Sequence, residues 1–355
     1  MKKLLACCVG CGAVLLVIAG PVRAQSPADT PGEPKPVDVI AYYYPWYHGG
    51  DWSRHPYVGT PVLGEYGTDD PDAARLHIAW CVEAGIDGLC VSWWGEGSQT
   101  DQHLQAGLLA ADNADDITFC IYYESLKLDG LDGEHDVSVD FAHPAVMTQM
   151  IEDFRYLKET YFERGNYYTI DGRPVVGLYV TRVFVGFSAE HADRLREAVG
   201  VEVFLIGDEV YYGPQDSPDT ARHGPGVFDA VSAYNMHTDP RINDGEPAWD
   251  YMQREAWPVY RNWAQDERVW FMPKVMPSYE DFRGHDSLAG SAEGFGLMLA
   301  SAAEMAAGDP AGSRGVVFIT SFNEWWEGST IEPAEEYGTS YLDAIRRWRD
   351  GGADE

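Results

Sequence analysis

Cysteine and basic residues are scarce in this chain of 355 residues, and each shortage excludes a class of protein. Only Cys81, Cys90 and Cys120 follow the first 24 residues, no two of them are spaced as C-x-x-C, and H-E-x-x-H is absent. A disulfide framework and the common zinc motifs are therefore excluded, and we expect buried thiols. Lysine and arginine number 25 against 57 acidic residues, a formal net charge of −32. Such a surface repels nucleic acids and favours a neutral or cationic ligand.

Long apolar runs are also lacking, except at the N-terminus. Residues 1–24 combine two lysines, an apolar stretch and small residues before a cleavage point, the pattern of a secretory signal peptide. We predict cleavage after Ala24, which takes the net charge from −32 to −35 because the segment holds three basic residues and no acid. A lipoprotein is the alternative, but its cysteine follows the apolar stretch, whereas Cys7, Cys8 and Cys11 precede most of it.

The rest of the chain predicts one exported domain. Residues 25–37 are rich in proline and polar residues, which is typical of a flexible leader. No later stretch reaches the roughly 18 consecutive apolar residues of a membrane span. We therefore expect a single domain over residues 38–350, periplasmic or extracellular, monomeric and without a membrane span.

Apolar, β-rich segments alternate with helical patterns along this domain. The first helical pattern opens at Asp72 behind Pro71 and closes at Gly85, which are suitable start and stop signals. Eight strands alternating with helices predict an α/β fold, the (β/α)8 TIM barrel. An open doubly wound sheet is the alternative, but no G-x-G-x-x-G follows the first strand. The strand candidates are VDVIAYYY, IDGLCVSWW, ITFCIYYE, RPVVGLYV, VEVFLIGD, FDAVSAYN, RVWFMPKVM and GVVFITSF.

Active sites of such barrels lie at the carboxyl ends of the strands and in the loops that follow. In this sequence those positions are rich in aromatic and acidic residues. Tryptophan and tyrosine stack on the apolar faces of sugar rings, so the pattern predicts a carbohydrate site. The residues concerned are Tyr44, Trp46, His48, Trp52, His55, Trp93, Trp94, Glu124, Asp208, Glu209, Tyr234, His237 and Glu324.

The segment TSFNEWWEGSTIEP, residues 320–333, holds the candidates for catalysis. Glycoside cleavage generally uses two carboxyl groups, one protonated and one ionised. Glu324 and Glu327 share a side only if the chain turns after the strand, because in an extended strand they point to opposite faces. The neighbouring tryptophans, Trp325 and Trp326, reduce the hydration of both carboxyl groups. We predict that Glu324 and Glu327 are the catalytic pair.

Several of these residues also have structural explanations. We interpret Asp208 and Glu209 as side chains that hold turns, with metal or substrate binding as the alternative. One of Trp325 and Trp326 is as consistent with packing between barrel and helix as with a sugar platform. The three histidines are candidates for bonds to sugar hydroxyls.

Residues 320–333 resemble the signature S-F-N-E-W-H-E-G-T-x-I-E of glycoside hydrolase family 99, the endo-α-1,2-mannosidases and endo-α-1,2-mannanases. Supporting similarities are YYYPWY at residues 42–47, the segment from LGEYG to SWWG at residues 63–95, and YYES at residues 122–125. The resemblance covers roughly residues 38 to 345. It implies a (β/α)8 barrel that cleaves α-mannosidic bonds inside a glycan with retention, without a metal or other cofactor.

The resemblance also implies roles for single residues. Glu324 matches the glutamate that deprotonates the sugar's own 2-hydroxyl, which then attacks the anomeric carbon to give a 1,2-anhydro sugar. Glu327 matches the acid that assists the leaving oxygen and then acts as base. The matches to substrate-contacting residues are Asn323, Glu124, Trp93 or Trp94, and Tyr234, and we expect Tyr44, Trp46, His237 and Trp326 to contribute.

One departure from the family stands between the two acids, where Trp326 replaces the usual histidine. The sugar, its linkage and chain-internal action therefore stay open. Two other functions also stay open. One is a hydrolase of the same fold that uses an ordinary two-carboxylate mechanism on another polysaccharide, with Glu124 or Glu209 as nucleophile, and the other is a non-catalytic carbohydrate-binding barrel.

Overall fold

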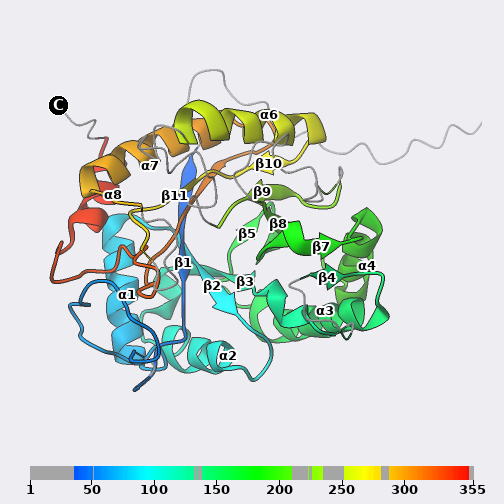
Figure 1. Ribbon diagram of the computed structural model, residues 1–355, viewed down its shortest axis with the longest axis horizontal. Helices are drawn as coiled ribbons and strands as arrows, with labels where there is room; N and C mark the ends of the chain where they lie inside the picture. The colour runs from blue at the N-terminus through cyan, green and yellow to red at the C-terminus, as the bar shows by residue number, and fades with distance from the viewer. Residues whose placement is uncertain are drawn as a thin grey trace, which may run out of the picture. The chain divides into compact units, whose positions relative to one another are not determined.

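A ring of parallel strands forms the centre of the computed structural model (Figure 1). The structure describes residues 36–50, 52–131, 133, 138–209, 223, 226–234, 252–280 and 288–351. All eight predicted strands are present, which confirms the predicted (β/α)8 barrel. In order around the ring they are β1 (Val37–Tyr43), β2 (Gly88–Trp93), β3 (Thr118–Tyr123), β6 (Arg173–Leu178), β8 (Phe204–Asp208), β9 (Ala230–Ser232), β10 (Trp270–Phe271) with β11 (Lys274–Val275), and β12 (Gly315–Ile319), which pairs with β1.

The seventh strand position is divided in two, and each half pairs with one of the two neighbouring strands. β10 pairs with β9 and β11 pairs with β12, while Met272 and Pro273 lie between the two halves. Pro273 has no N–H to give to a ladder. Its carbonyl still accepts a hydrogen bond from Phe318 N–H (3.0 Å), and Met272 N–H donates to the Val231 carbonyl (3.0 Å). The backbone therefore links both neighbours across the interruption.

Helices surround the strands in Figure 1, so most strand residues are buried on both faces, as parallel sheets require. The α-helices are α1 (Pro71–Ala84), α2 (Gln99–His103), α3 (Pro144–Leu157), α4 (Ala189–Val199), α6 (Trp257–Glu267), α7 (Ala292–Ala307) and α8 (Ser340–Arg349). Short π or 3-10 turns are η1 (Leu104–Leu108), η2 (Ala114–Asp116), η3 (Ser125–Leu128), η4 (Lys158–Phe162), η5 (Thr181–Val183) and η7 (Met252–Ala256). Outside the ring, β4 (Val139–Asp140) pairs with β7 (Phe184–Val185), and β5 (Thr169–Ile170) pairs with β6.

Local signals account for the ends of α1. The Asp70 side chain accepts a hydrogen bond from Asp72 N–H (2.9 Å), and Pro71 occupies the first helical position, where a missing N–H costs nothing. Gly85 ends the helix with φ at +85°, which glycine adopts without strain. The helix thus begins one residue before the predicted Asp72.

The remaining expectations concern the ends of the chain and the thiols. The predicted signal peptide and most of the predicted leader lie outside the described residues, and Val37 already belongs to β1. No helix in the described part of the chain combines the length and the apolar character needed to cross a membrane. Cys81, Cys90 and Cys120 are buried and free, as predicted.

Candidate active site

The loop after β12 brings Glu324 and Glu327 to one region. The chain turns over residues 325–328, which meets the condition under which two residues three apart share a side. Burial raises the pKa of both Tyr44 and Tyr234, and the charges of the two glutamates raise each of these pKa values further. The two carboxylates therefore act on the same pair of tyrosines.

Each of the two glutamates accepts a hydrogen bond from a tyrosine of another strand end. Glu324 is buried, and its Oε1 accepts from Tyr47 OH (3.3 Å) and from the backbone N–H of Trp326 (3.0 Å). Glu327 is half-buried, and its Oε2 accepts from Tyr234 OH (2.7 Å). The segments after β1 and β9 thus orient the two carboxylates that follow β12.

A third carboxyl group, that of Glu124, joins them from the end of β3. It is buried, and its Oε1 accepts a hydrogen bond from Ser92 Oγ (2.5 Å). Burial, helped by the charges of Asp208 and Glu327, raises the pKa of Glu124 to about 8, although the Ser92 hydrogen bond opposes the rise. At neutral pH the group is therefore protonated, and it can donate a hydrogen bond but is a poor nucleophile.

The raised pKa of Glu124 makes stability depend on pH. Between pH 4.5 and about 8 the folded protein holds one proton more than the unfolded chain, so the stability contribution of Glu124 falls as pH rises through this range. Glu124→Gln stays neutral and still accepts from Ser92. We therefore expect the free energy of unfolding of Glu124→Gln, relative to that of the wild type, to increase by a few kcal/mol, in order of magnitude, from pH 5 to pH 9.

Urea unfolding of both proteins across this pH range measures the difference. Glu335→Gln, which removes an exposed carboxylate, is the matched control and should follow the wild-type pH dependence. An advantage of Glu124→Gln that is the same at every pH would contradict the assignment.

Asp208 and Glu209 hold the strand ends together, the role favoured from the sequence. The donors to the Asp208 carboxylate are Val180 N–H (2.9 Å), Tyr122 OH (3.0 Å) and Tyr234 N–H (2.6 Å). Glu209 Oε1 accepts from Thr181 Oγ1 (3.0 Å) and lies 3.2 Å from His223 Nδ1. Both acids are thus engaged by their own surroundings.

Lys274 places a buried amine next to this acidic cluster, a feature that no sequence motif indicated. Its Nζ donates to the carbonyl of Tyr234 (2.7 Å). Burial lowers the pKa of Lys274 well below its usual value, while the charges of Asp208 and Glu327 oppose that change. Lys274 therefore fixes the backbone of the tyrosine that contacts Glu327.

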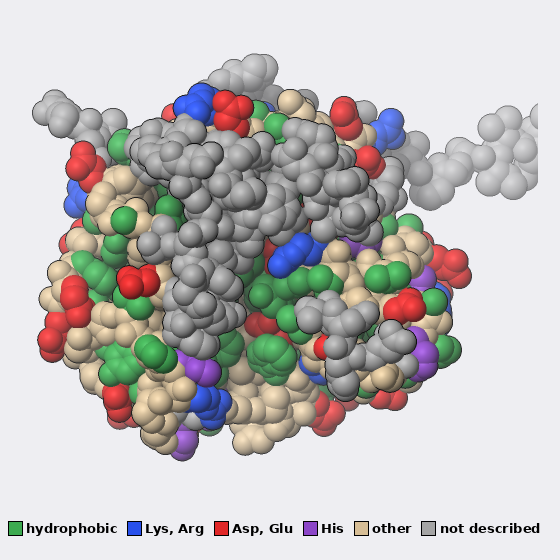
Figure 2. Space-filling model, in the orientation of Figure 1, with side chains coloured by type: hydrophobic (Ala, Val, Ile, Leu, Met, Phe, Trp, Pro, Cys, Tyr) green, Lys and Arg blue, Asp and Glu red, His purple; other side chains and the backbone are tan. Residues whose placement is uncertain are grey.

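Tyr44, Trp46 and Trp326 form a row of stacked rings beside Glu324. Ring centroids are 4.4 Å apart for Tyr44 and Trp46, and 5.3 Å apart for Trp46 and Trp326. Trp326 also contacts Tyr47 and, edge to face, His55, with centroids 5.1 Å apart in both cases. In Figure 2, hydrophobic and acidic side chains meet near the centre of the visible face. The replacement of the family's histidine by Trp326 thus extends an aromatic surface.

The other predicted aromatic residues divide into buried and accessible ones. Trp93 is fully buried, donates from Nε1 to Asp101 (2.8 Å) and stacks on Tyr156 of α3, so it has no exposed face for a sugar ring. Trp94 is 39% exposed and is the member of the pair that is placed to stack. Trp52 is buried against Tyr47.

Asn323 is part of the site as a residue that holds Tyr44, whereas His48 lies away from the two glutamates. Asn323 is fully buried and bonds both backbone groups of Tyr44, accepting from its N–H (2.7 Å) and donating to its carbonyl (3.1 Å). It therefore positions the first ring of the aromatic row. His48 lies apart, 3.2 Å from Asp69, and His237 falls outside the described residues.

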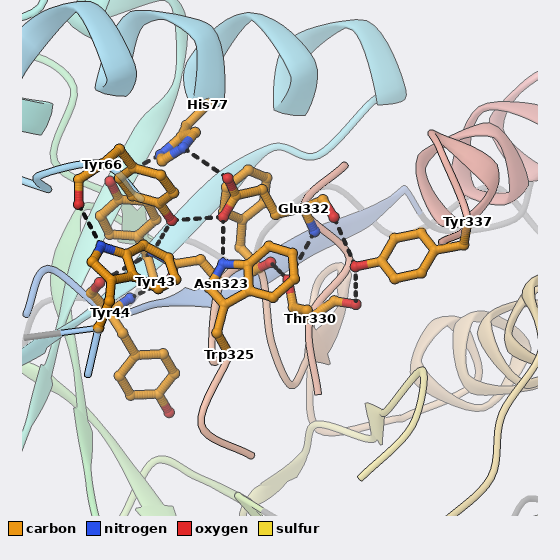
Figure 3. A network of polar contacts seen from close by, with 11 residues as sticks. Tyr43, Tyr44, Tyr66, His77, Asn323, Trp325, Thr330, Glu332 and Tyr337 are labelled. Atoms are coloured by element: carbon orange, nitrogen blue, oxygen red, sulfur yellow. Dashed lines mark hydrogen bonds and ion pairs between the residues drawn. The ribbon is translucent and has the colours of Figure 1, made fainter. Parts of the chain in front are cut away.

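A buried polar network behind the site includes residues that the sequence reasoning missed (Figure 3). Glu332 Oε2 accepts from Tyr66 OH (2.6 Å) and from Trp325 Nε1 (2.9 Å), and Glu332 Oε1 lies 3.3 Å from His77 Nε2. Tyr43 OH is 3.1 Å from the other ring nitrogen of His77. Trp325 is fully buried here, so of the two tryptophans between the glutamates it is the one that packs. The sequence feature that could have indicated this network is Glu332, a third glutamate within residues 320–333.

Fold and site together define a TIM barrel whose strand ends carry an acidic and aromatic site of the kind that suits carbohydrates. The chain belongs to the family described as glycosyltransferase WbsX, whose model matches residues 44–345. Glycoprotein endo-α-1,2-mannosidase-like proteins of mouse and human are each 23% identical and align with 81% of this chain. The alignments cover 64% and 63% of those relatives, so the chain spans less than two thirds of their length.

Solved structures show the same fold. The family 99 endo-α-mannosidase of Bacteroides thetaiotaomicron has a TM-score of 0.62 and 24% identity, and the alignment covers 88% of this chain and 96% of that one. A structure described as a glycoside hydrolase-like protein has a TM-score of 0.72 and 20% identity, over 92% of this chain and 97% of its own. These similarities show that the chain shares its fold with the family 99 endo-α-mannosidase.

Proposed function

We propose that this protein is a retaining glycoside hydrolase that cleaves α-mannosidic bonds inside a glycan. The observation that carries the proposal is the pair Glu324 and Glu327, which share one turn and each accept a hydrogen bond from a tyrosine beside the aromatic row. Relatives named endo-α-1,2-mannosidase-like support the choice of α-mannose.

In the proposed reaction the substrate supplies its own nucleophile. Glu324 takes the proton of the 2-hydroxyl, O2 forms a bond to C1, and the bond from C1 to the leaving oxygen breaks as Glu327 protonates that oxygen. Glu327 then takes a proton from water and the water oxygen bonds to C1. The C1–O2 bond of the anhydro sugar breaks at the same time, and O2 recovers its proton from Glu324. Two inversions at C1 give net retention. The buried position of Glu324 keeps its carboxylate poorly hydrated, which favours proton transfer from a hydroxyl.

The ordinary two-carboxylate mechanism fits these surroundings less well. Glu124 is protonated at neutral pH, and Glu209 is engaged by Thr181 and His223. We assign Glu124 a hydrogen bond to a sugar hydroxyl, and we assign stacking on sugar rings to Trp94 and Trp326. Tyr44 is buried and Trp46 is stacked between Tyr44 and Trp326, so these two rings support the end of the aromatic row.

Transfer to a sugar acceptor is a second candidate, favoured by the family's description as a glycosyltransferase. It shares the first half of the reaction, and a sugar hydroxyl replaces water in the second. The acidic cluster and the net charge of −32 repel the diphosphate of a nucleotide sugar, so the donor in either case is a neutral glycan.

The first residues of the sequence indicate the compartment in which the protein acts. We propose that residues 1–24 are removed and that the protein works in the periplasm or outside the cell as a monomer. The supporting observation is the signal-peptide pattern.

The test is a panel of α-mannans and other polysaccharides, with the anomeric proton of the first product followed by NMR. We expect α-configured oligosaccharides from an α-mannan, and no turnover of a substrate whose reacting 2-hydroxyl is replaced by hydrogen. A β-configured first product contradicts retention, and rapid cleavage of the 2-deoxy substrate contradicts the anhydro route. Tight binding without turnover across the panel would show a carbohydrate-binding barrel instead.

A further inference from the structure

A second cluster of ligand-type side chains lies in the segments that follow β1 and β2. His48, Asp69 and His103 each offer one ligand atom, and these atoms all lie within 4.8 Å of one another. His48 Nδ1 is 3.2 Å from Asp69 Oδ1. Across the described ranges of the chain, no other set of three His, Cys, Asp or Glu side chains meets this spacing.

We propose that His48, Asp69 and His103 bind a divalent transition-metal ion, with Zn²⁺ as the natural occupant. Two imidazoles and one carboxylate are a donor set that Zn²⁺ accepts, with water completing the shell. Ca²⁺ and Mg²⁺ prefer sites made wholly of oxygen ligands, so this set disfavours them.

The surroundings of His103 orient its ring as a ligand. Thr68 Oγ1 lies 2.9 Å from the carbonyl of Tyr47, and because a carbonyl only accepts, the single hydroxyl hydrogen of Thr68 points there. Thr68 Oγ1 therefore accepts from His103 Nδ1, which is 3.0 Å away. In the neutral ring this leaves the lone pair on Nε2. A ligand imidazole that gives its other N–H to a fixed acceptor is the usual arrangement around metals.

Glycine makes room for the carboxylate, and the site is open to solvent. A Cβ at Gly67 would lie 2.4 Å from Asp69 Oδ1 and 3.8 Å from His48 Nδ1, so a larger residue would displace the Asp69 side chain. The side chains of His48 and Asp69 are 56% and 37% exposed, which gives an ion a path to the site. The acidic chain also attracts cations.

Such an ion would join the loop after β1, which supplies His48 and Asp69, to α2, which supplies His103. His48 follows Tyr47, whose hydroxyl donates to Glu324, and His103 is the last residue of α2. Gln99, at the start of α2, already donates to the carbonyl of Trp46 (3.0 Å). A bound ion would therefore strengthen an existing connection between α2 and the loop that carries Tyr47, as a structural site without a part in the chemistry.

Metal binding is tested by titrating chelator-treated, untagged protein with Zn²⁺ in a calorimeter, a readout that does not depend on any enzyme activity. We expect one saturable site, absent with Ca²⁺ or Mg²⁺ at the same concentration. His48→Ala and His103→Ala should each weaken Zn²⁺ binding by about 10-fold or more, because each removes one of three ligands. His191→Ala, which removes a histidine of α4, is the matched control and should bind as the wild type does.

Two further measurements keep the test decisive. His48 is exposed, so His48→Ala should unfold at the wild-type temperature without metal and carries the test even if His103→Ala is unstable. Co²⁺ should give visible ligand-field bands in the wild type that are lost in His48→Ala. The absence of saturable Zn²⁺ binding, or undiminished binding by folded His48→Ala, overturns the proposal.

Discussion

Glu327→Gln is expected to lower kcat on an α-mannan by about 10²- to 10⁴-fold, and Glu324→Gln by at least as much. Glutamine keeps the shape and still accepts from Tyr234 or Tyr47, so the fold should be unchanged. It cannot give a proton to the leaving oxygen or take one from the 2-hydroxyl. Initial rates of oligosaccharide release measure the loss of kcat, and circular dichroism checks that the fold is unchanged.

An activated leaving group separates the two roles. A glycosyl fluoride needs no protonation at its leaving atom, so Glu327→Gln should regain much of its first-step rate on such a substrate. Glu324→Gln should not, because the 2-hydroxyl still has to lose its proton. The same recovery in both variants would contradict the ordered assignment.

Glu335→Gln is the matched control for both variants. It removes an exposed glutamate a few residues farther along the same segment and should leave kcat unchanged. Full activity in both Glu324→Gln and Glu327→Gln would remove the basis of the proposed function, whereas the metal proposal would stand unaffected.

Glu332→Ala is expected to lower the free energy of unfolding by about 3–5 kcal/mol. The carboxylate is fully buried, and its removal leaves Tyr66 OH and Trp325 Nε1 without their acceptor and His77 beside a cavity. Unsatisfied polar groups in a dry interior account for the large value. Urea unfolding followed by tryptophan fluorescence gives the difference.

Two further variants show whether the loss of stability comes from the buried network. Glu332→Gln keeps the volume and one acceptor oxygen, so it should lose less stability than the alanine variant. Glu335→Ala, at an exposed position three residues away, should change stability by less than about 0.5 kcal/mol. If Glu332→Ala and Glu335→Ala were equally stable, the network of Figure 3 would not support the loop.

The sequence predicted those site residues whose position after a strand is enough to place them at the rim of the barrel. Glu124 was found because it directly follows β3, and Glu324 and Glu327 because they lie in the loop after β12, since strand ends converge in a barrel. Trp93 and Trp94 were not separable, since neighbouring strand residues point to opposite faces and the sequence does not say which face meets a helix. Tyr47 and Lys274 were missed because their roles depend on contacts with segments far away in the chain.

The sequence by itself determined the eight strands, the first helix to within one residue of its start, the buried thiols and the position of the two acidic candidates after the last strand. Periodicity, capping and residue type are local properties. Only the tertiary structure decided that Pro273 divides the seventh strand without opening the ring and that Asn323 clamps Tyr44. It also decided that burial raises the pKa of Glu124. Such features arise from hydrogen bonds and burial between residues distant in sequence, and these exist only once the barrel has closed.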